Sequence, residues 1–142
     1  MKYFIGTDHA GYEIKPFVIE YLEKKGIEVE DLGTYSTDSV DYPDYAHKVS
    51  KAVLENENSK GILICGSGIG MSLAANKHKG IRAALCHDYY TAKMARLHND
   101  ANILCFGARI VGLGVVESIL DAWLETEFEG GRHQRRVEKI DI

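Results

Sequence analysis

The stretch at residues 60–76, KGILICGSGIGMSLAAN, constrains the fold more than any other part of the sequence. It begins with a short apolar run, residues 61–64, which is typical of a parallel strand that is covered on both faces. Cys65 ends this run, and the glycine-rich segment 66–70 follows it. Because glycine has no Cβ, the backbone of that segment can turn tightly into a loop. A helix is predicted from residue 69, and the order of strand, loop and helix indicates an open α/β sheet.

The loop at 66–70 is also predicted to bind an anion. Its backbone N–H groups can turn inward, and the following helix adds the positive end of its dipole. A cysteine at the end of a strand is often only a small buried apolar residue. Cys65, however, precedes this loop, where the local field favours the thiolate and we expect the thiol to ionise readily. The stretch therefore predicts a reactive sulfur that faces a site for a phosphate or a reaction oxyanion.

Strand and helix patterns alternate along the whole chain. Alternation with short loops predicts a three-layer α/β/α sandwich with a five-stranded parallel sheet, of the Rossmann-like or flavodoxin-like kind. Apolar and amphipathic periodicities give the expected element ranges. The strands are expected at residues 2–7, 27–32, 61–64, 81–86 and 103–106, and the helices at 12–25, 43–55, 69–76, 88–97 and 113–125.

Length and composition fit a single domain over residues 1–142, with a basic tail at about 130–142. The hydrophobic fraction of 45% is ordinary for a globular protein, and no apolar run reaches the length of a membrane span. The N-terminus lacks a signal-peptide pattern, so we expect a cytoplasmic protein. A net charge of −4 argues against nucleic acid as the main partner. Cys65, Cys86 and Cys105 lack paired spacing, which predicts neither a metal site nor a disulfide framework.

Polar residues follow several predicted strands at one edge of the sheet. If the first and third strands are neighbours, Asp8 and His9 lie across a crevice from Cys65. A carboxylate beside an imidazole can move protons or hold a hydroxyl group, although Asp8 can equally cap a helix and His9 can be a solvated loop residue. Arg109 follows the fifth strand and is placed to bind an anion. Tyr42 either covers the pocket or simply packs beside it.

Two further groups lie near helix ends. His98 and Asn99 end the fourth predicted helix, where His98 is either a charge cap or an acid–base group beside an amide that binds a hydroxyl. Arg132 and Arg136 are four residues apart, so in a helical tail they share one face and can clamp a phosphate. The alternative for these arginines is a solvated basic surface. The tail follows a glycine pair, and we expect it to reach a neighbouring subunit.

Three common phosphate-binding motifs are absent. A cysteine phosphatase loop needs an arginine six positions after its cysteine, where this chain has Met71. A Walker A loop needs a lysine, which Gly70-Met71-Ser72 lacks. The glycines at 66, 68 and 70 also have the wrong spacing for GxGxxG, so a dinucleotide-dependent enzyme is not expected.

Five motifs together resemble the ribose-5-phosphate isomerase B family, over nearly the whole chain. They are GTDHAG at 6–11, DYPDYA at 41–46, CGSGIGMSLAANK at 65–77, HND at 98–100 and GGRHQRR at 130–136. The resemblance implies an aldose–ketose isomerase of the pentose phosphate pathway that interconverts ribose 5-phosphate and ribulose 5-phosphate through an enediolate. It implies no metal and no organic cofactor, and a homodimer or dimer of dimers with sites at the subunit interface.

The same resemblance implies roles for individual residues. Cys65 is the base that moves a proton between C1 and C2, and His98 opens the sugar ring with the help of Asp8. Many relatives have threonine where this chain has Ser67, and the hydroxyl is retained. Some relatives use a carboxylate base in place of the cysteine. The enediolate oxygen is held by Gly66, Ser67, Gly68, Ile69 and Gly70, sugar hydroxyls by Asn99, and the phosphate or nearby oxygens by His9, Arg109, Arg132 and Arg136.

Other functions remain open at this level. The family resembles galactose-6-phosphate and allose-6-phosphate isomerases, so a six-carbon sugar phosphate is the first alternative substrate. A non-catalytic module that binds sugar phosphates is the second alternative. A flavin-binding module would share the fold but is disfavoured by Cys65 inside the loop.

Overall fold

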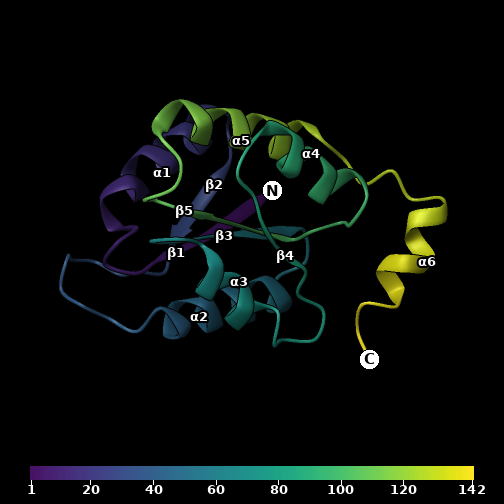
Figure 1. Ribbon diagram of the computed structural model, residues 1–142, viewed down its shortest axis with the longest axis horizontal. Helices are drawn as coiled ribbons and strands as arrows, with labels where there is room; N and C mark the ends of the chain where they lie inside the picture. Colours follow the sequence, from purple (N-terminus) through teal and green to yellow (C-terminus); the bar gives the residue numbers. More distant parts are fainter.

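Five parallel strands form the middle layer of the computed structural model, which describes all 142 residues. Their order across the sheet is β2-β1-β3-β5-β4 (Figure 1). The first and third strands are neighbours, which is the condition for a crevice between Asp8 and Cys65: β1 pairs with β3 along six residues from Lys2↔Ser59 to Thr7↔Ile64. The strands are β1 (Lys2–Thr7), β2 (Glu28–Asp31), β3 (Ser59–Cys65), β4 (Ala83–Leu85) and β5 (Ile103–Gly107).

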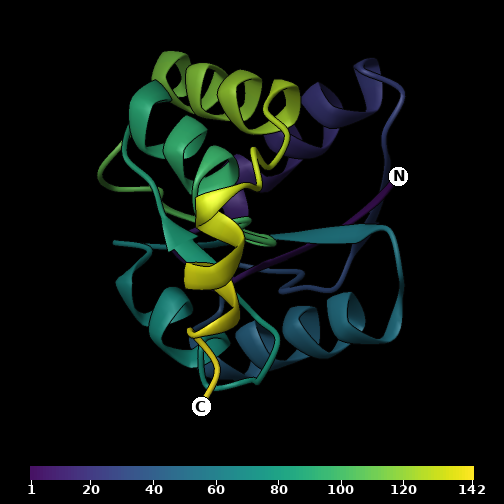
Figure 2. The same cartoon turned by 90° about the vertical axis from the view of Figure 1, so that its right-hand side faces the viewer.

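Helices cover both faces of this sheet, as the alternating pattern predicts. One face carries α1 (Lys15–Lys24), α4 (Tyr89–Leu97) and α5 (Leu113–Glu125), and the other carries α2 (Tyr42–Glu55) and α3 (Ile69–Ala75) (Figures 1 and 2). A short 3₁₀ turn, η1 (Tyr12–Ile14), precedes α1. The last helix, α6 (Arg132–Glu138), lies outside the three layers. None of the helices has the length and apolar character that a bilayer span requires.

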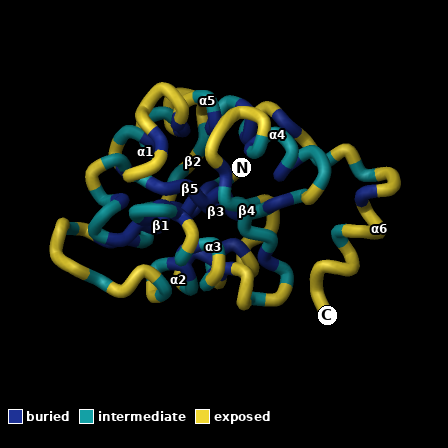
Figure 3. Tube along the Cα trace, viewed as in Figure 1, coloured by how far each residue is buried: buried dark blue, intermediate teal, exposed yellow.

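Two apolar cores lie on the two faces of the sheet, and β3 contributes to both. Ile62 and Ile64 pack in the core under α1, α4 and α5, whereas Leu63 and Cys65 pack in the core under α2 and α3. Successive side chains of a strand point to opposite faces, which explains why the buried part of this strand, residues 61–65, is apolar on both faces. Figure 3 shows the sheet as the most buried part of the chain and α6 as largely exposed.

Two predicted elements and the strand order differ clearly from the prediction. The helix predicted at 12–25 is divided into η1 and α1, and Pro16, which has no N–H, lies in the first turn of α1. The strand predicted at 81–86 is only β4, because the Ile81 N–H donates to the His78 carbonyl in a turn and the Arg82 N–H donates to Asn102 Oδ1. The strand order also exchanges the last two strands relative to the flavodoxin order 2-1-3-4-5.

The topology isolates the loop that follows β3. The chain leaves β1 and β5 toward α1 and α5 on one face of the sheet, but it leaves β3 toward α3 on the other. Neighbouring strands whose following loops turn to opposite faces leave a crevice at their carboxyl ends. β3 has such a neighbour on each side, so its loop lies between two crevices.

Candidate functional site

A cavity of about 550 Å³ opens at the carboxyl edge of the sheet, around the loop after β3. The cavity brings together segments from the ends of β1, β3 and β5 and from the start of α2. With β1 and β3 adjacent, Asp8 lines this cavity together with Cys65, as expected for that arrangement, whereas His9 does not line it. The residues that line the cavity are Asp8, Tyr42, Cys65, Gly66, Ser67, Ile69, Gly70, Leu73, Arg109 and Ile110.

The β3–α3 loop holds the Cys65 sulfur with a backbone donor. The Gly68 N–H donates to Cys65 Sγ at 3.1 Å, and Cys65 is 5% exposed, at the wall of the cavity. Gly68 has a φ of +79°, and a Cβ there would lie 2.7 Å from the Phe106 carbonyl carbon. Only glycine fits that position, so the contact between the amide and the sulfur depends on the glycine that the sequence singles out.

Several other N–H groups of the loop remain free to bind a ligand. The Ile69 N–H is not one of these, because it donates to Ser67 Oγ at 3.2 Å. The N–H groups of Gly66, Ser67 and Gly70 have no acceptor within the chain. Unpaired donors beside a thiol, at the start of a helix, are the arrangement that binds a developing oxyanion.

Cys65 is the only cysteine that lines the cavity. Burial raises the pKa of the Cys86 thiol to about 12 and also raises the pKa of Cys105. Both of these thiols therefore stay protonated at neutral pH, inside the apolar cores. Of the three thiols, only that of Cys65 borders the cavity, and the other two pack within the cores.

Asp8 lies at the cavity and also caps the turn after β1. Asp8 Oδ1 accepts hydrogen bonds from the N–H groups of Ala10 at 2.9 Å and Gly11 at 3.0 Å. The capping role and the position at the site therefore coexist. His9 borders this turn, and its Nδ1 accepts a hydrogen bond from the Val40 N–H at 3.2 Å. A neutral His9 ring that accepts at Nδ1 carries its proton on Nε2 and can donate from there.

Arg109 and Tyr42 lie against the two outer glycines of the loop. Arg109 Nη1 is 3.1 Å from the place that a Cβ on Gly66 would occupy, and the Tyr42 ring is 2.4 Å from the corresponding place on Gly70. The Arg109 N–H also donates to the Gly66 carbonyl at 3.0 Å. The loop after β5 is thus fastened to the loop after β3, with a guanidinium at the cavity.

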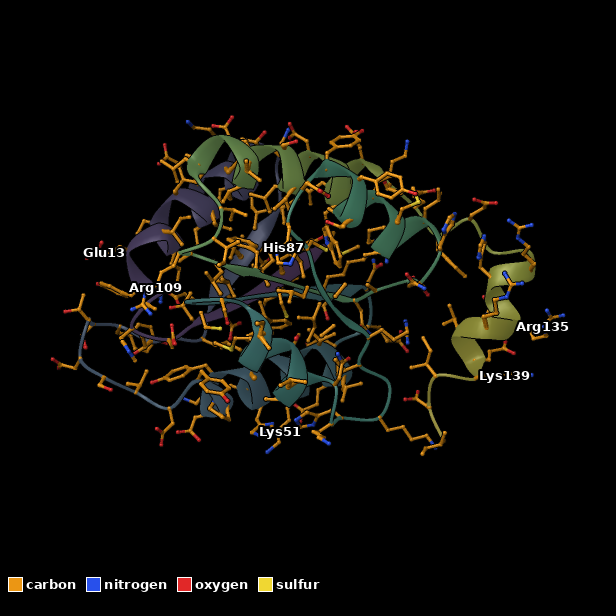
Figure 4. All side chains as sticks on the ribbon, viewed as in Figure 1. Glu13, Lys51, His87, Arg109, Arg135 and Lys139 are labelled. Atoms are coloured by element: carbon orange, nitrogen blue, oxygen red, sulfur yellow. The ribbon has the colours of Figure 1, made fainter.

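Four of the predicted site residues lie at the opposite, amino edge of the sheet. His98 and Asn99 follow α4, whereas Arg132 and Arg136 belong to α6. Figure 4 shows this separation, with Arg109 at one end of the molecule and Arg135 of α6 at the other. Within one chain, these residues do not join Cys65, so the expectation that the site is shared between subunits stays a prediction.

His133 is a buried residue of α6 that the sequence analysis misses. Its ring stacks on His98 with centroids 4.2 Å apart and planes 14° from parallel. Burial, and then the neighbouring His98, lower the pKa of His133. The residue stands within the GGRHQRR motif, which is the only signal in the sequence that marks it.

The histidine pair forms a cluster with Glu129 that resembles a metal site only in composition. The ligating atoms of His98, Glu129 and His133 lie within 4.8 Å of one another. Nearly parallel stacked rings direct their nitrogen lone pairs side by side and not toward one point, whereas zinc requires convergent tetrahedral ligands. As arranged, the cluster does not match a zinc site.

The fold and the cavity define an α/β protein whose thiol faces backbone oxyanion donors at a strand-end loop. A family model described as "Ribose/Galactose Isomerase" matches residues 3–140. The chain is 50% identical to "Ribose-5-phosphate isomerase B" of Escherichia coli, across 98% of this chain and 93% of the relative. It is also 54% identical to a "Putative sugar phosphate isomerase" of Rickettsia bellii, across 96% of this chain and 95% of the relative.

Solved structures agree with these matches. Ribose-5-phosphate isomerase B of Clostridium thermocellum superposes with a TM-score of 0.96 at 54% identity, covering 99% of this chain and 95% of that one. The enzyme of the same name from Thermotoga maritima superposes with a TM-score of 0.95 at 56% identity, covering 99% and 97%. The chain belongs to the ribose/galactose isomerase family, and the resemblance in the sequence motifs is confirmed.

Proposed function

We propose that this protein is an aldose–ketose isomerase that interconverts ribose 5-phosphate and ribulose 5-phosphate. The observation that carries the proposal is the cavity in which the Cys65 sulfur, the free N–H groups of its loop and Asp8 meet. Family membership and the high identity to relatives named ribose-5-phosphate isomerase B support the choice of reaction and substrate. In this proposal the enzyme works in the cytoplasm, in the pentose phosphate pathway.

The proposed reaction moves one proton between two carbons. The Cys65 thiolate removes the proton from C2 of the open-chain aldose, and the electron pair moves onto O1 to give an enediolate. Ser67 and the free N–H groups of the loop hold this negative oxygen, and preorganised donors of this kind contribute about 3–4 kcal/mol each. The thiol then returns the proton to C1 while the O2 proton passes to O1, which leaves a hydroxyl group at C1 and the ketone at C2.

The remaining candidate residues bind and open the sugar. His98 opens the furanose ring with Asp8, and Asn99 binds the sugar hydroxyls. Tyr42 covers the cavity. The phosphate and nearby oxygens are bound by His9, Arg109, Arg132 and Arg136. A phosphate anchor of this kind contributes remote binding energy that orients the reacting carbons.

These roles require a homodimer or a dimer of dimers in which α6 and His98 of one chain approach Cys65 of another. Apart from His133 and the half-buried Val137, every residue of α6 is exposed. Ile69, Leu73 and Ile110 are large apolar side chains that are exposed around the cavity. A second copy would cover that apolar surface and bring the basic helix to the phosphate.

The test is a coupled assay with ribose 5-phosphate, allose 6-phosphate and galactose 6-phosphate as substrates. We expect the highest kcat/KM with ribose 5-phosphate, and exchange of the C2 hydrogen with solvent deuterium during turnover. A higher kcat/KM with a six-carbon substrate would replace the proposed substrate. Binding of ribose 5-phosphate without any exchange would instead show a non-catalytic sugar-phosphate module.

A further inference from the structure

Lys15 is a buried cation outside the cavity and has no role in the proposed reaction. It is the first residue of α1 and is only 3% exposed. Its Nζ donates to Asp31 Oδ1 at 2.8 Å and to the carbonyl oxygen of Thr34. The ammonium also lies 5.4 Å from the ring centroid of Tyr12 and 5.1 Å from that of Tyr35. Lysine is rarely buried so fully unless it is paired, so this arrangement calls for a physical reason.

The partners of Lys15 attach a turn to the end of β1. Asp31 Oδ1 also accepts the Gly33 N–H at 2.9 Å. The Thr7 N–H donates to the Gly33 carbonyl at 2.7 Å, and the Thr34 N–H donates back to the Thr7 carbonyl at 2.9 Å. Thr7 is the last residue of β1 and directly precedes Asp8. Lys15 therefore binds the turn that lies beside Asp8, the acidic residue of the cavity.

The loop at 34–41 runs from this turn to Tyr42, at the edge of the cavity. In Figure 1 it projects from the same end of the molecule that carries Arg109 in Figure 4. Near its far end, the Val40 N–H donates to His9 Nδ1. Tyr42 follows directly, begins α2 and lies against Gly70. One end of the loop contacts Lys15, and at the other end lie His9, which follows the cavity residue Asp8, and Tyr42, which lines the cavity.

We propose that Lys15 is a positioning residue for substrate binding. Through Asp31 and Thr34, it keeps the loop at 34–41 where Val40 orients His9 and Tyr42 covers the cavity. The inference rests on the proposed function and deepens it, since it assigns the orientation of a phosphate-binding residue to a buried ion pair on another element. Without the ammonium, the Thr34 carbonyl loses a donor and Asp31 loses its counter-charge, so this end of the loop is held only by its hydrogen bonds to Thr7 and Asp31 and is loosened.

The test replaces Lys15 by methionine, which has a similar length but no charge. For Lys15→Met, we expect the KM for ribose 5-phosphate to rise about tenfold while kcat stays within about twofold, because ground-state and transition-state binding are weakened equally. In substrate-free protein, ¹⁵N NMR should show one neutral His9 tautomer, protonated on Nε2, in the wild type and a mixture in the variant. The matched control is Lys24→Met, on the same helix, whose side chain is 73% exposed. We expect it to change neither measurement.

Either an unchanged KM or an unchanged His9 tautomer in Lys15→Met overturns the proposal, even if the variant is less stable. Should Lys15→Met fail to fold, Asp31→Asn retains the shape and the acceptor and removes only the charge of the partner. We then expect the same two changes, smaller in size, and their absence would equally overturn the proposal. Failure of the proposed function would appear in the wild-type protein, whereas failure of this inference appears only in the comparison of variant with wild type.

Discussion

The two edges of the sheet are built in opposite ways. At the carboxyl edge, the loops after β3 and β5 are packed without spare room, since a Cβ on Gly68 or Gly107 would lie within 2.7 Å of neighbouring backbone atoms. At the amino edge, Gly130 and Gly131 lead into α6 with nothing within 4 Å of their Cβ positions. The carboxyl edge is closely packed around a cavity, and at the amino edge α6 extends away from the three layers.

This difference separates two kinds of work. Donors that stabilise a charge during a reaction must already be in place, because their advantage over water is that they need not reorganise. Groups that recognise a distant phosphate need reach and charge more than fixed geometry. In the proposed function, the sulfur and its amides at the tight edge have the first role and the basic helix at the open edge has the second, and four predictions test this division.

The largest effect is expected at the tight edge. Cys65→Ala should lower kcat about 10²–10⁴-fold, the usual contribution of a general base, because alanine cannot accept the proton. The free energy of unfolding should change by about 1 kcal/mol or less, since little apolar surface is lost. Steady-state kinetics and urea denaturation measure the two quantities.

The matched control for this variant is Cys105→Ala, in the same apolar core but away from the cavity. It should retain wild-type turnover. Near-normal turnover in Cys65→Ala would contradict the role of the thiolate.

The second prediction joins the two edges. Cys65→Ala and His98→Gln should each be nearly inactive, but dimers assembled from an equal mixture should recover about a quarter of wild-type activity, since half of the random dimers carry one intact site of two. Mixing Cys65→Ala with Ser67→Ala, both at the same edge, should recover nothing. If the first mixture also stays inactive, the shared site is wrong.

The third prediction compares two glycines with left-handed backbone. Gly68 and Gly130 have φ values of +79° and +72°, but only Gly68 is enclosed. Gly130→Ala should lower the free energy of unfolding by about 1–2 kcal/mol, the cost of the conformation alone. Gly68→Ala should cost about 2–5 kcal/mol, because overpacking adds to that strain. Equal losses of unfolding free energy in urea denaturation would mean that the close packing around Gly68 adds nothing to the cost of the alanine.

The smallest effect concerns pH and the end of α3. His78 follows this helix, and its Nε2 lies 2.7 Å from His47 Nδ1. Burial, and then His47, lower the pKa of His78 from its ordinary 6.5. Around and below pH 6.5 the unfolded chain therefore binds more protons than the folded one. The free energy of unfolding is consequently highest above that pH and falls as the pH drops. His78→Gln should make the fall between pH 7.5 and 5.5 shallower.

The control for the pH experiment is His87→Gln, at an exposed position before α4 (Figure 4). Its stability should follow that of the wild type across the range. If His78→Gln also follows the wild type, His78 does not contribute to the acid sensitivity.

The sequence predicts the layers and the centre of the site because both follow from periodicity. A buried strand that ends in Cys65 and glycines must deliver them to the carboxyl edge, where Asp8 and Arg109 also arrive. Leu73 and Ile110 line the same cavity, but nothing in the sequence marks them, because an apolar residue in a short helix or turn can belong to the core or to the surface. The burial of Lys15 is equally unpredictable, since a lysine in the first turn of a helix usually belongs to solvent and its partners are distant in sequence.

The position of β3 between two crevices has a consequence for how substrate preference can change. The reactive loop and the side walls of the cavity belong to different connections of the chain, so each wall can be remodelled beyond the close contacts at Gly107 and Arg109 while the sulfur stays in place. A longer segment after β5, or a shorter one before α2, would alter the length of sugar that fits and leave the chemistry alone. Such independence gives one scaffold a route to serve both five- and six-carbon phosphosugars.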